Sequence, residues 1–335
     1  MSLEGSPSSF SESKLCAKVQ TRSGGPAFAC FRPFVGPPLA LPASLVSPVF
    51  AGFLRDCEAS LASLGRCDLE SNCASTLLQV MPAFYSEESE RQVLVNAALS
   101  TLLGRRLSLI QPDAAESSSR SDGGLVASAE GLDALLLLTE HKNEMGSSDP
   151  YFQLQRAYGM YWEASGRWHS HPHRCDACPA LALEVVGPLL RVNALASLHA
   201  NRVLCEPLTP FLPFLQLRDQ PEAMARLLVT LRALRNAVKG LDAHYTALSR
   251  SRSGSGLGAA GGGGRSPDIA LPYPLREGGR FSAARQLCDD RLVYVAKDES
   301  RGGELVCVKF SRARGDGRAV QAAWAALEAR ENRED

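Results

Sequence analysis

The chain has 335 residues, of which 45% are hydrophobic and 21% are charged, a composition typical of globular proteins rather than of disordered chains. Its 36 Lys and Arg residues equal its 36 Asp and Glu residues, so the overall charge indicates no nucleic-acid partner. It excludes none either, because a local basic groove is compatible with zero net charge. The length is sufficient for two modest domains, each with its own core.

Composition divides the chain into four parts. Residues 1–40 are rich in Ser, Pro and Gly and are predicted to be disordered. Residues 41–248 contain apolar runs with helix or strand periodicity and are predicted to form the main domain. The Gly- and Ser-rich residues 249–268 are typical of a flexible linker, and residues 269–335 are predicted to form a smaller, β-rich unit.

Several features favour an intracellular protein. The ten cysteines are scattered along the chain, a usage typical of reduced thiols. The N-terminus has no apolar run that would form a cleavable signal, and the longest apolar region, 179–198, is interrupted by Glu184, Pro188 and Arg191. We therefore expect a protein of the nucleus or cytoplasm that is not inserted in a membrane.

The main domain is predicted to alternate helices with strands. Residues 41–104 are predicted to be helical, and in the last of these helices Ser86 is placed to cap the start and Gly104 to end it. The apolar runs that follow predict strands at 107–111, 125–129, 133–142, 180–187, 188–198 and 202–207. Two helices are predicted among and after them, at 149–163 with Asp149 as its cap, and at 221–248 with an apolar stripe.

The strand predicted at 133–142 ends in charged residues where a turn is usual. Its end reads LLLLTEHKNE, from Leu135 to Glu144. Because side chains alternate between the two faces of a strand, Glu140 and Lys142 are expected on one face and His141 on the other. A hairpin with the preceding strand would bring Asp122 alongside Glu140.

These residue types point to metal-assisted hydrolysis. Two converging carboxylates favour a hard cation, and Mg²⁺ binds one or two carboxylates together with water and phosphate oxygens. A lysine beside them can orient or deprotonate an attacking water and offset charge on a scissile phosphate. Taken alone, however, the Glu-x-Lys tripeptide favours a solvated strand end with an ordinary ion pair.

A wider set of residues resembles a known family. Asp122 in SDGG, followed by LLLLTEHKNEMGSSDPYFQLQRAYGMYW, resembles the restriction-endonuclease-like PD-(D/E)xK superfamily. The likeness is greater to the version next to kinase-like domains in fungal, oomycete and algal proteins, including Crinkler-type effectors. The matching positions after Asp122 are Glu140, Lys142, Asn143, Glu144, Gly146, Asp149, Pro150, Gln153, Tyr158, Tyr161 and Trp162.

The resemblance covers roughly residues 80–248 and implies an α/β fold with a restriction-endonuclease-like αβββαβ core and added helices. It implies that Asp122 and Glu140 bind Mg²⁺ or Mn²⁺ and that Lys142 acts on the water. It also implies that Gln153 steadies the site from the next helix and that DNA is the substrate.

Other acids compete for the metal-binding roles. Ser121 stands where the family pattern has Pro, and Asp113, before a long serine-rich loop, is the main rival of Asp122. Asp133 ranks below Asp122, because it lies seven residues before Glu140 and on the opposite face of the strand. Glu90, on the preceding helix, is a possible third carboxylate but is read more simply as a solvated helix acid.

A second cluster, HSHPHRCDAC, is a candidate zinc site. It offers ligands of the kind that Zn²⁺ prefers, namely His169, His171, His173, Cys175 and Cys178. The histidines alternate around a Pro instead of following the usual spacing, and no second Cys-x-x-Cys pair exists. We therefore expect a surface loop without zinc.

The unit after the linker resembles a truncated N-lobe of a protein kinase, with antiparallel strands that turn at Gly302–Gly303 and a helix at 319–331. Lys309 stands where kinases have the strand lysine that pairs with ATP phosphates. The loop that is glycine-rich in kinases reads CDDR at 288–291, and its acids would repel phosphates. No catalytic Asp loop and no Asp-Phe-Gly follow, so Lys309 is expected to be non-functional and kinase activity is not expected.

Two functions from different classes fit these observations. The first is a Mg²⁺-dependent nuclease that hydrolyses DNA. The second is a catalytically inactive interaction or effector module, or a fragment of a nuclease–kinase fusion, which contacts a protein partner through the kinase-like segment. The zero net charge and the missing glycines motivate the second.

Overall fold

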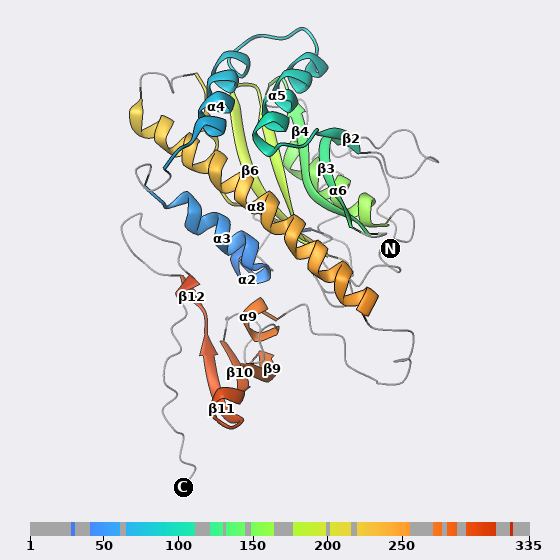
Figure 1. The fold of residues 1–335 in the computed structure, drawn as a ribbon, viewed down its shortest axis with the longest axis vertical. Coiled ribbons are helices and arrows are strands. Elements are labelled where there is room, and N and C mark those ends of the chain that lie inside the picture. Colours follow the sequence, from blue (N-terminus) through green and yellow to red (C-terminus); the bar gives the residue numbers. More distant parts are fainter. Residues whose placement is uncertain are drawn as a thin grey trace.

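The computed structural model describes residues 28–30, 41–60, 65–110, 121–129, 132–144, 149–163, 177–198, 202–215, 220–254, 271–276, 280–286, 293–312 and 322–323. The architecture is mixed α/β. A large mixed sheet has helices on both of its faces, and a small antiparallel sheet lies beyond one end of it (Figure 1). An α/β fold with a smaller β-rich unit was predicted, and this coarse description is confirmed.

The helices that precede the sheet are α2 (Ala43–Val46), α3 (Pro48–Cys57), α4 (Asp68–Val80) and α5 (Glu88–Leu103). Gly104 ends α5 in the left-handed conformation with φ 66°, as predicted. The prediction that Ser86 caps this helix is wrong. The N-cap is Glu87, whose side chain makes no capping hydrogen bond, because α5 begins one residue later than the cap signal indicates.

The large sheet contains β1 (Phe28–Cys30), β2 (Ser108–Ile110), β3 (Ser121–Ala129), β4 (Leu132–Lys142), β5 (Ala180–Val186), β6 (Leu189–Leu198), β7 (Arg202–Pro207) and β8 (Leu212–Pro213). Its order is β1-β7-β6-β5-β4-β3-β2, and β8 pairs with β6. The pairs β4–β5 and β1–β7 are parallel and the others antiparallel. β1 falls within residues 1–40, for which no ordered structure was predicted.

β4 and β5 form the centre of the sheet and of the hydrophobic core. The leucines from Leu135 to Leu138 are at most 1% exposed, and every residue of β5 is buried. Strands buried on both faces read as continuous apolar runs, which is why the sequence indicated them clearly. Helix α6 (Pro150–Glu163) makes the crossover that the parallel β4–β5 pair requires.

Helix α6 runs antiparallel to β4 and places its first turn beside the ends of two strands. The Asp149 carboxylate accepts from the backbone N–H groups of Tyr151 and Phe152 at 3.1 and 3.3 Å, so the predicted cap is confirmed. Near the other end of α6, the Tyr161 hydroxyl donates to the carbonyl of Asp133 at 2.9 Å. The first turn of α6 therefore lies at the carboxyl ends of β4 and β5 (Figure 1).

Helix α8 (Pro221–Gly254) crosses the opposite face of the sheet diagonally (Figure 1). Its apolar stripe packs against α3 and against β3 and β4. The helix was predicted over 221–248 and extends six residues further, into the region predicted as a linker. The rest of that linker, 255–268, lies outside the described residues. No described helix is both long enough and apolar enough to cross a membrane.

The small unit contains α9 (Tyr273–Arg276), β9 (Phe281–Gln286), β10 (Val293–Asp298) and β11 (Glu304–Lys309), with the short β12 (Ser311–Arg312) and β13 (Ala322–Ala323). β9, β10 and β11 form an antiparallel sheet, and the predicted turn is present with φ 72° at Gly302 and 84° at Gly303. Leu45 of α2 packs into its core beside Tyr294. Of the helix predicted at 319–331, the two described residues form β13 instead of a helix.

Candidate active site

The β3–β4 hairpin brings Asp122 next to Glu140. Gly123 pairs with Thr139 in the antiparallel register, so the preceding residue of β3 stands opposite Glu140 on the same face. The Asp122 carboxylate accepts the backbone N–H of His141 at 2.7 Å. Its side chain is therefore fixed against the adjacent strand rather than pointing freely into solvent.

Helix α5 fixes the main chain of Asp122. The Asn96 side-chain amide donates to the carbonyl of Asp122 at 3.0 Å, and the Gln92 amide donates to the same oxygen. This approach requires Gly123, because a Cβ there would stand 2.6 Å from both the Asn96 amide nitrogen and the Thr139 hydroxyl. Gly123 thus serves the packing of α5 on the hairpin, whereas a Cβ at Gly124 would meet Ile110 of β2.

Lys142 joins the hairpin to α5 through two carboxylates. Its Nζ lies 3.0 Å from Glu140 Oε1 and 2.7 Å from Glu88 Oε1. The side chains of Lys142 and Glu140 are 12% and 7% exposed, so this ion pair is partly shielded from water, whereas Glu88 is more open at 38%. Asp122, Glu140, Lys142 and Glu88 form one charged cluster, which we call the strand-end cluster.

Burial and mutual repulsion raise the pKa values of Asp122 and Glu140 in the strand-end cluster. Burial and the nearby Asp122 carboxylate raise the pKa of Glu140 to about 8, even though Lys142 opposes the change. Burial also raises the pKa of Asp122 above its ordinary value, against the hydrogen bond from His141. Burial alone would lower the pKa of Lys142, but Glu140 and Glu88 outweigh it and raise that pKa. Lys142 therefore remains an ammonium ion.

The residues behind the strand-end cluster are structural. His141 is fully buried on the opposite face, with Nε2 3.2 Å from the Asn96 side-chain oxygen. Burial lowers the pKa of His141 to about 3, so its imidazole is neutral. Arg91 donates to the Asn143 side chain at 3.2 Å and to the carbonyl of Gly187 at 2.8 Å. Asn143 thus anchors the turn after β4.

Gln153 lies in the first turns of α6, toward the same end of β4. It is 3% exposed, and its Oε1 has no hydrogen-bond partner among the described residues. In the structure it makes no hydrogen bond to Asp122, Glu140 or Lys142. A buried amide oxygen without a partner is costly to leave unsatisfied and is free to bind a donor or a cation.

The strand-end cluster fits a hard divalent cation. The carboxylates of the buried Glu140 and the half-buried Asp122 repel each other, and a cation between them would relieve that repulsion. Asp122 and Glu140 would be the protein ligands, and the free Gln153 oxygen is a further oxygen donor nearby. No group of three or more His, Cys, Asp or Glu in the described part of the chain is arranged to hold a metal, so any ion would depend on water and substrate oxygens as well.

The structure locates two of the three acids that compete with Asp122 for a metal-binding role. Asp133 pairs with Ser128 near the tip of the hairpin, at the opposite end of β4 from Glu140. Asp113 lies outside the described residues. Glu90 takes part in none of the contacts of the strand-end cluster, and Glu88, two residues earlier, contacts Lys142 instead. Sequence reasoning missed Glu88, because several acids fill the first turn of α5 and only packing selects one.

The other candidate sites receive less support. His169, His171, His173 and Cys175 lie outside the described residues, and Cys178 is fully buried in the core of the main domain. Lys309, the kinase-like lysine, is exposed at the end of β11 and forms no ion pair with any described acid.

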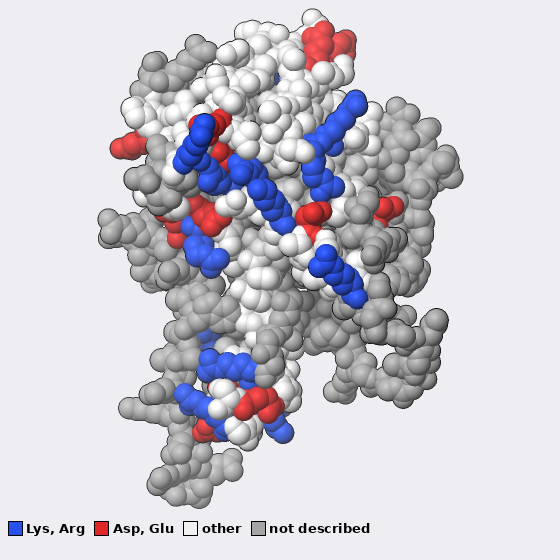
Figure 2. Space-filling model, in the orientation of Figure 1, with Lys and Arg blue, Asp and Glu red and all other residues white. Residues whose placement is uncertain are grey.

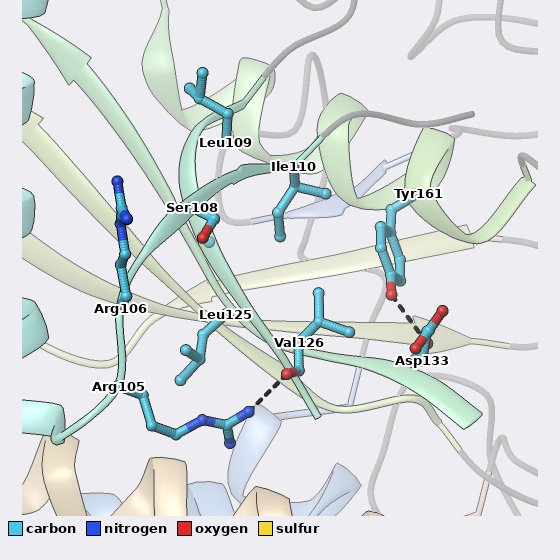
Figure 3. A pocket seen from close by; sticks show the side chains of 10 residues that line it. Arg105, Arg106, Ser108, Leu109, Ile110, Leu125, Val126, Asp133 and Tyr161 are labelled. Carbon is cyan, nitrogen blue, oxygen red and sulfur yellow. Dashed lines mark hydrogen bonds between the residues drawn. The ribbon is translucent and has the colours of Figure 1, made fainter. Parts of the chain in front are cut away.

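A pocket of about 580 Å³ lies elsewhere, beside the edge strand β2. It is lined by Arg105, Arg106, Ser108, Leu109, Ile110, Gly124, Leu125, Val126, Asp133 and Tyr161. Figure 3 shows the Arg105 guanidinium directed at the Val126 carbonyl and Tyr161 directed at Asp133, so polar groups of the lining are already paired. No member of the strand-end cluster lines the pocket, and we do not assign the candidate chemistry to it.

Basic side chains gather along α8, and Figure 2 shows them following its diagonal course. They are Arg226, Arg232, Arg235, Lys239 and Arg250. Two of them share one acid, because Arg232 and Arg235 lie 2.6 and 2.8 Å from the buried carboxylate of Glu70. α8 covers the face of the sheet opposite to α6, so this basic stripe does not border the strand-end cluster.

Comparison of the chain with protein-family models, with curated proteins and with solved structures gives no significant match. The geometry of the strand-end cluster is therefore the observation that bears on function.

Proposed function

We propose that the main domain is a Mg²⁺- or Mn²⁺-dependent nuclease that hydrolyses phosphodiester bonds of DNA at the strand-end cluster. The observation that carries this proposal is the pairing of Asp122 with Glu140 across the β3–β4 hairpin, with Lys142 3.0 Å from Glu140. Two acids and a lysine in this order at one strand end are what the PD-(D/E)xK resemblance implies.

The order of elements supports the finer fold assignment. α5, β2, β3, β4, α6 and β5 follow one another in the chain, which is the αβββαβ order of a restriction-endonuclease-like core. The acids and the lysine lie on the second and third strands of that series. The remaining helices and β6–β8 are then additions around this core.

Each residue of the cluster has a separate role in the proposed reaction. Asp122 and Glu140 would hold the ion, which supplies Lewis-acid polarisation of the phosphate and lowers the pKa of a bound water. Lys142, kept protonated by its two carboxylates, offsets negative charge that develops on the phosphate rather than acting as a base. Glu88 positions Lys142 by its hydrogen bond at 2.7 Å.

A supercoiled-plasmid nicking assay with added Mg²⁺ or Mn²⁺ tests the proposal. We expect wild-type protein to nick the plasmid and Glu140→Ala and Lys142→Ala to lose at least about 100-fold in rate. Glu144→Ala is the matched control, since Glu144 is an exposed acid just after the same strand. Equal rates for wild type and Glu140→Ala, or no metal-dependent nicking by any form, would contradict catalysis.

The second candidate is a non-catalytic interaction module. The observation that favours it is that Lys142 is already held by two carboxylates, so the cluster is a satisfied ion-pair network without any substrate. Binding of a protein partner through the small unit with no metal-dependent nicking would support this alternative.

A further inference from the structure

A second charged pair lies beside the strand-end cluster on the same face of the sheet. In the parallel β4–β5 register Glu140 stands opposite Glu184, and in the antiparallel β5–β6 register Glu184 stands opposite Arg191. Register partners on adjacent strands project to the same face, so Glu140, Glu184 and Arg191 form a row across three strands. Two strand spacings separate Arg191 from Glu140, about 10 Å between their Cα atoms.

The guanidinium of Arg191 is held in one orientation. Its Nε and Nη2 donate to Glu184 Oε2 at 2.9 and 2.5 Å. The guanidinium carbon lies 4.3 Å from the ring centre of Phe211 and 5.3 Å from that of Tyr151. An arginine fixed by a carboxylate and by ring faces loses little side-chain entropy when it binds a further anion.

One nitrogen of this arginine remains available. Nη1 has no hydrogen-bond partner among the described residues, and the side chain is 19% exposed. The Asn193 amide donates to the same Glu184 oxygen at 3.4 Å, so the carboxylate is satisfied without using Nη1. Burial raises the pKa of Glu184, whereas the charge and hydrogen bonds of Arg191 and Asn193 lower it.

We propose that Arg191 is a substrate-positioning residue, whose Nη1 contacts the phosphate next to the scissile phosphate of a nucleic-acid strand, with the Phe211 ring beside it. The inference rests on the proposed nuclease function and adds a subsite to the same cluster. The Cα atom of Arg191 lies about two strand spacings from that of Glu140, and its guanidinium is held at Glu184 on the strand between them, so Arg191 is placed to contact a phosphate next to the one at Lys142. Arginine suits this role because its guanidinium stays charged and its Nη1 carries N–H donors that phosphate oxygens can accept.

The test combines binding and cleavage of one fluorescent 20-base-pair DNA duplex. In metal-free buffer, Arg191→Gln is expected to weaken Kd about 10-fold and to reduce the slope of log Kd against log salt by about 1, because one phosphate contact is lost. With Mg²⁺, the same variant is expected to raise KM about 10-fold and to leave kcat within about two-fold. Arg191→Lys keeps the charge and is expected to restore the salt slope.

Arg232→Gln is the matched control for loss of structure. Arg232 also donates Nε and Nη2 to a buried glutamate, Glu70, and its side chain is likewise 19% exposed, but it lies on α8 across the sheet. A salt slope and KM unchanged in Arg191→Gln would overturn the proposal. Equal losses of binding in Arg191→Gln and Arg232→Gln, at equal loss of melting temperature, would overturn it as well.

The two proposals fail in different ways. If Glu140→Ala abolishes cleavage while Arg191→Gln behaves as wild type, the nuclease function stands and the Arg191 contact is wrong. If wild type binds the duplex with an Arg191-dependent salt slope but does not cleave it with any metal, the contact stands and the hydrolytic function is wrong.

Discussion

Cation binding at the strand-end cluster is expected to depend steeply on pH, because Glu140 must lose a proton to become a ligand. Burial and Asp122 raise its pKa to about 8, so about 1% of Glu140 is ionised at pH 6 and about half at pH 8. The affinity for Mg²⁺ should therefore be about 50-fold weaker at pH 6 than at pH 8, or about 2.3 kcal/mol.

Isothermal titration with MgCl₂ at pH 6, 7 and 8 measures this difference directly. Repeating it in buffers of different ionisation enthalpy measures the released proton, which should approach one per ion at pH 6 and about one half at pH 8. Glu140→Gln is expected to bind weakly at every pH, and Glu144→Gln to behave as wild type. Equal Mg²⁺ affinities at pH 6 and pH 8 in wild-type protein, or a pH dependence that persists in Glu140→Gln, would refute the reasoning.

Glu140 also determines how the stability of the metal-free protein changes with pH. The pKa of Glu140 is raised from 4.5 to about 8 on folding, so between these values the folded state binds more protons than the unfolded state. The contribution of Glu140 to stability is therefore lost as pH rises from 4.5 to 8, and Mg²⁺ should restore part of it at the upper end. Melting temperatures recorded at pH 5.5 and 8, with and without Mg²⁺, measure both effects.

Two further predictions concern the packing that holds the site. Gly123→Ala should displace Asn96, because the new Cβ would lie 2.6 Å from its amide nitrogen, and should cost about 1–3 kcal/mol in denaturant unfolding together with most of the nicking activity. An unchanged midpoint and activity would contradict this account. Glu70→Ala should cost about 3 kcal/mol, because Arg232 and Arg235 lose their shared carboxylate, while the metal dependence of nicking is retained. A loss of metal dependence would instead show that α8 and the strand-end cluster are coupled.

The central strands, and the placement of Asp122, Glu140 and Lys142 at one strand end, could be predicted from the sequence for a specific reason. Apolar runs such as Leu135–Leu138 are buried on both faces of the sheet and leave an unambiguous signal. The period of two then fixes which side chains share a face, so Glu140 and Lys142 could be placed together. The position of Asp122 beside Glu140 could be predicted from the hairpin, because the antiparallel register allows few partners for Glu140.

The rest depends on packing that sequence periodicity does not encode. Glu88 was not selected, since three acids of similar character begin α5 and only the orientation of the helix on the hairpin directs one at Lys142. β1 has three residues, which is too short for a recognisable strand pattern, and it forms by pairing with β7. The approach of Glu184 to Glu140 requires the strand order, which the sequence left open.

The charges of the strand-end cluster connect the proton on Glu140 with the position of α5. The cluster contains three carboxylates and one ammonium group, so full ionisation would leave two uncompensated negative charges in a partly buried site. Without a cation, the raised pKa of Glu140 relieves part of that charge by retaining a proton. With a cation, Glu140 ionises, and Lys142 stays between it and Glu88 in position to meet an anionic substrate. Because Glu88 belongs to α5, which also fixes the main chain of Asp122 through Asn96, any displacement of α5 disturbs both acids at once. The packing of that helix on the hairpin is therefore what keeps Asp122, Glu140 and Lys142 in one geometry.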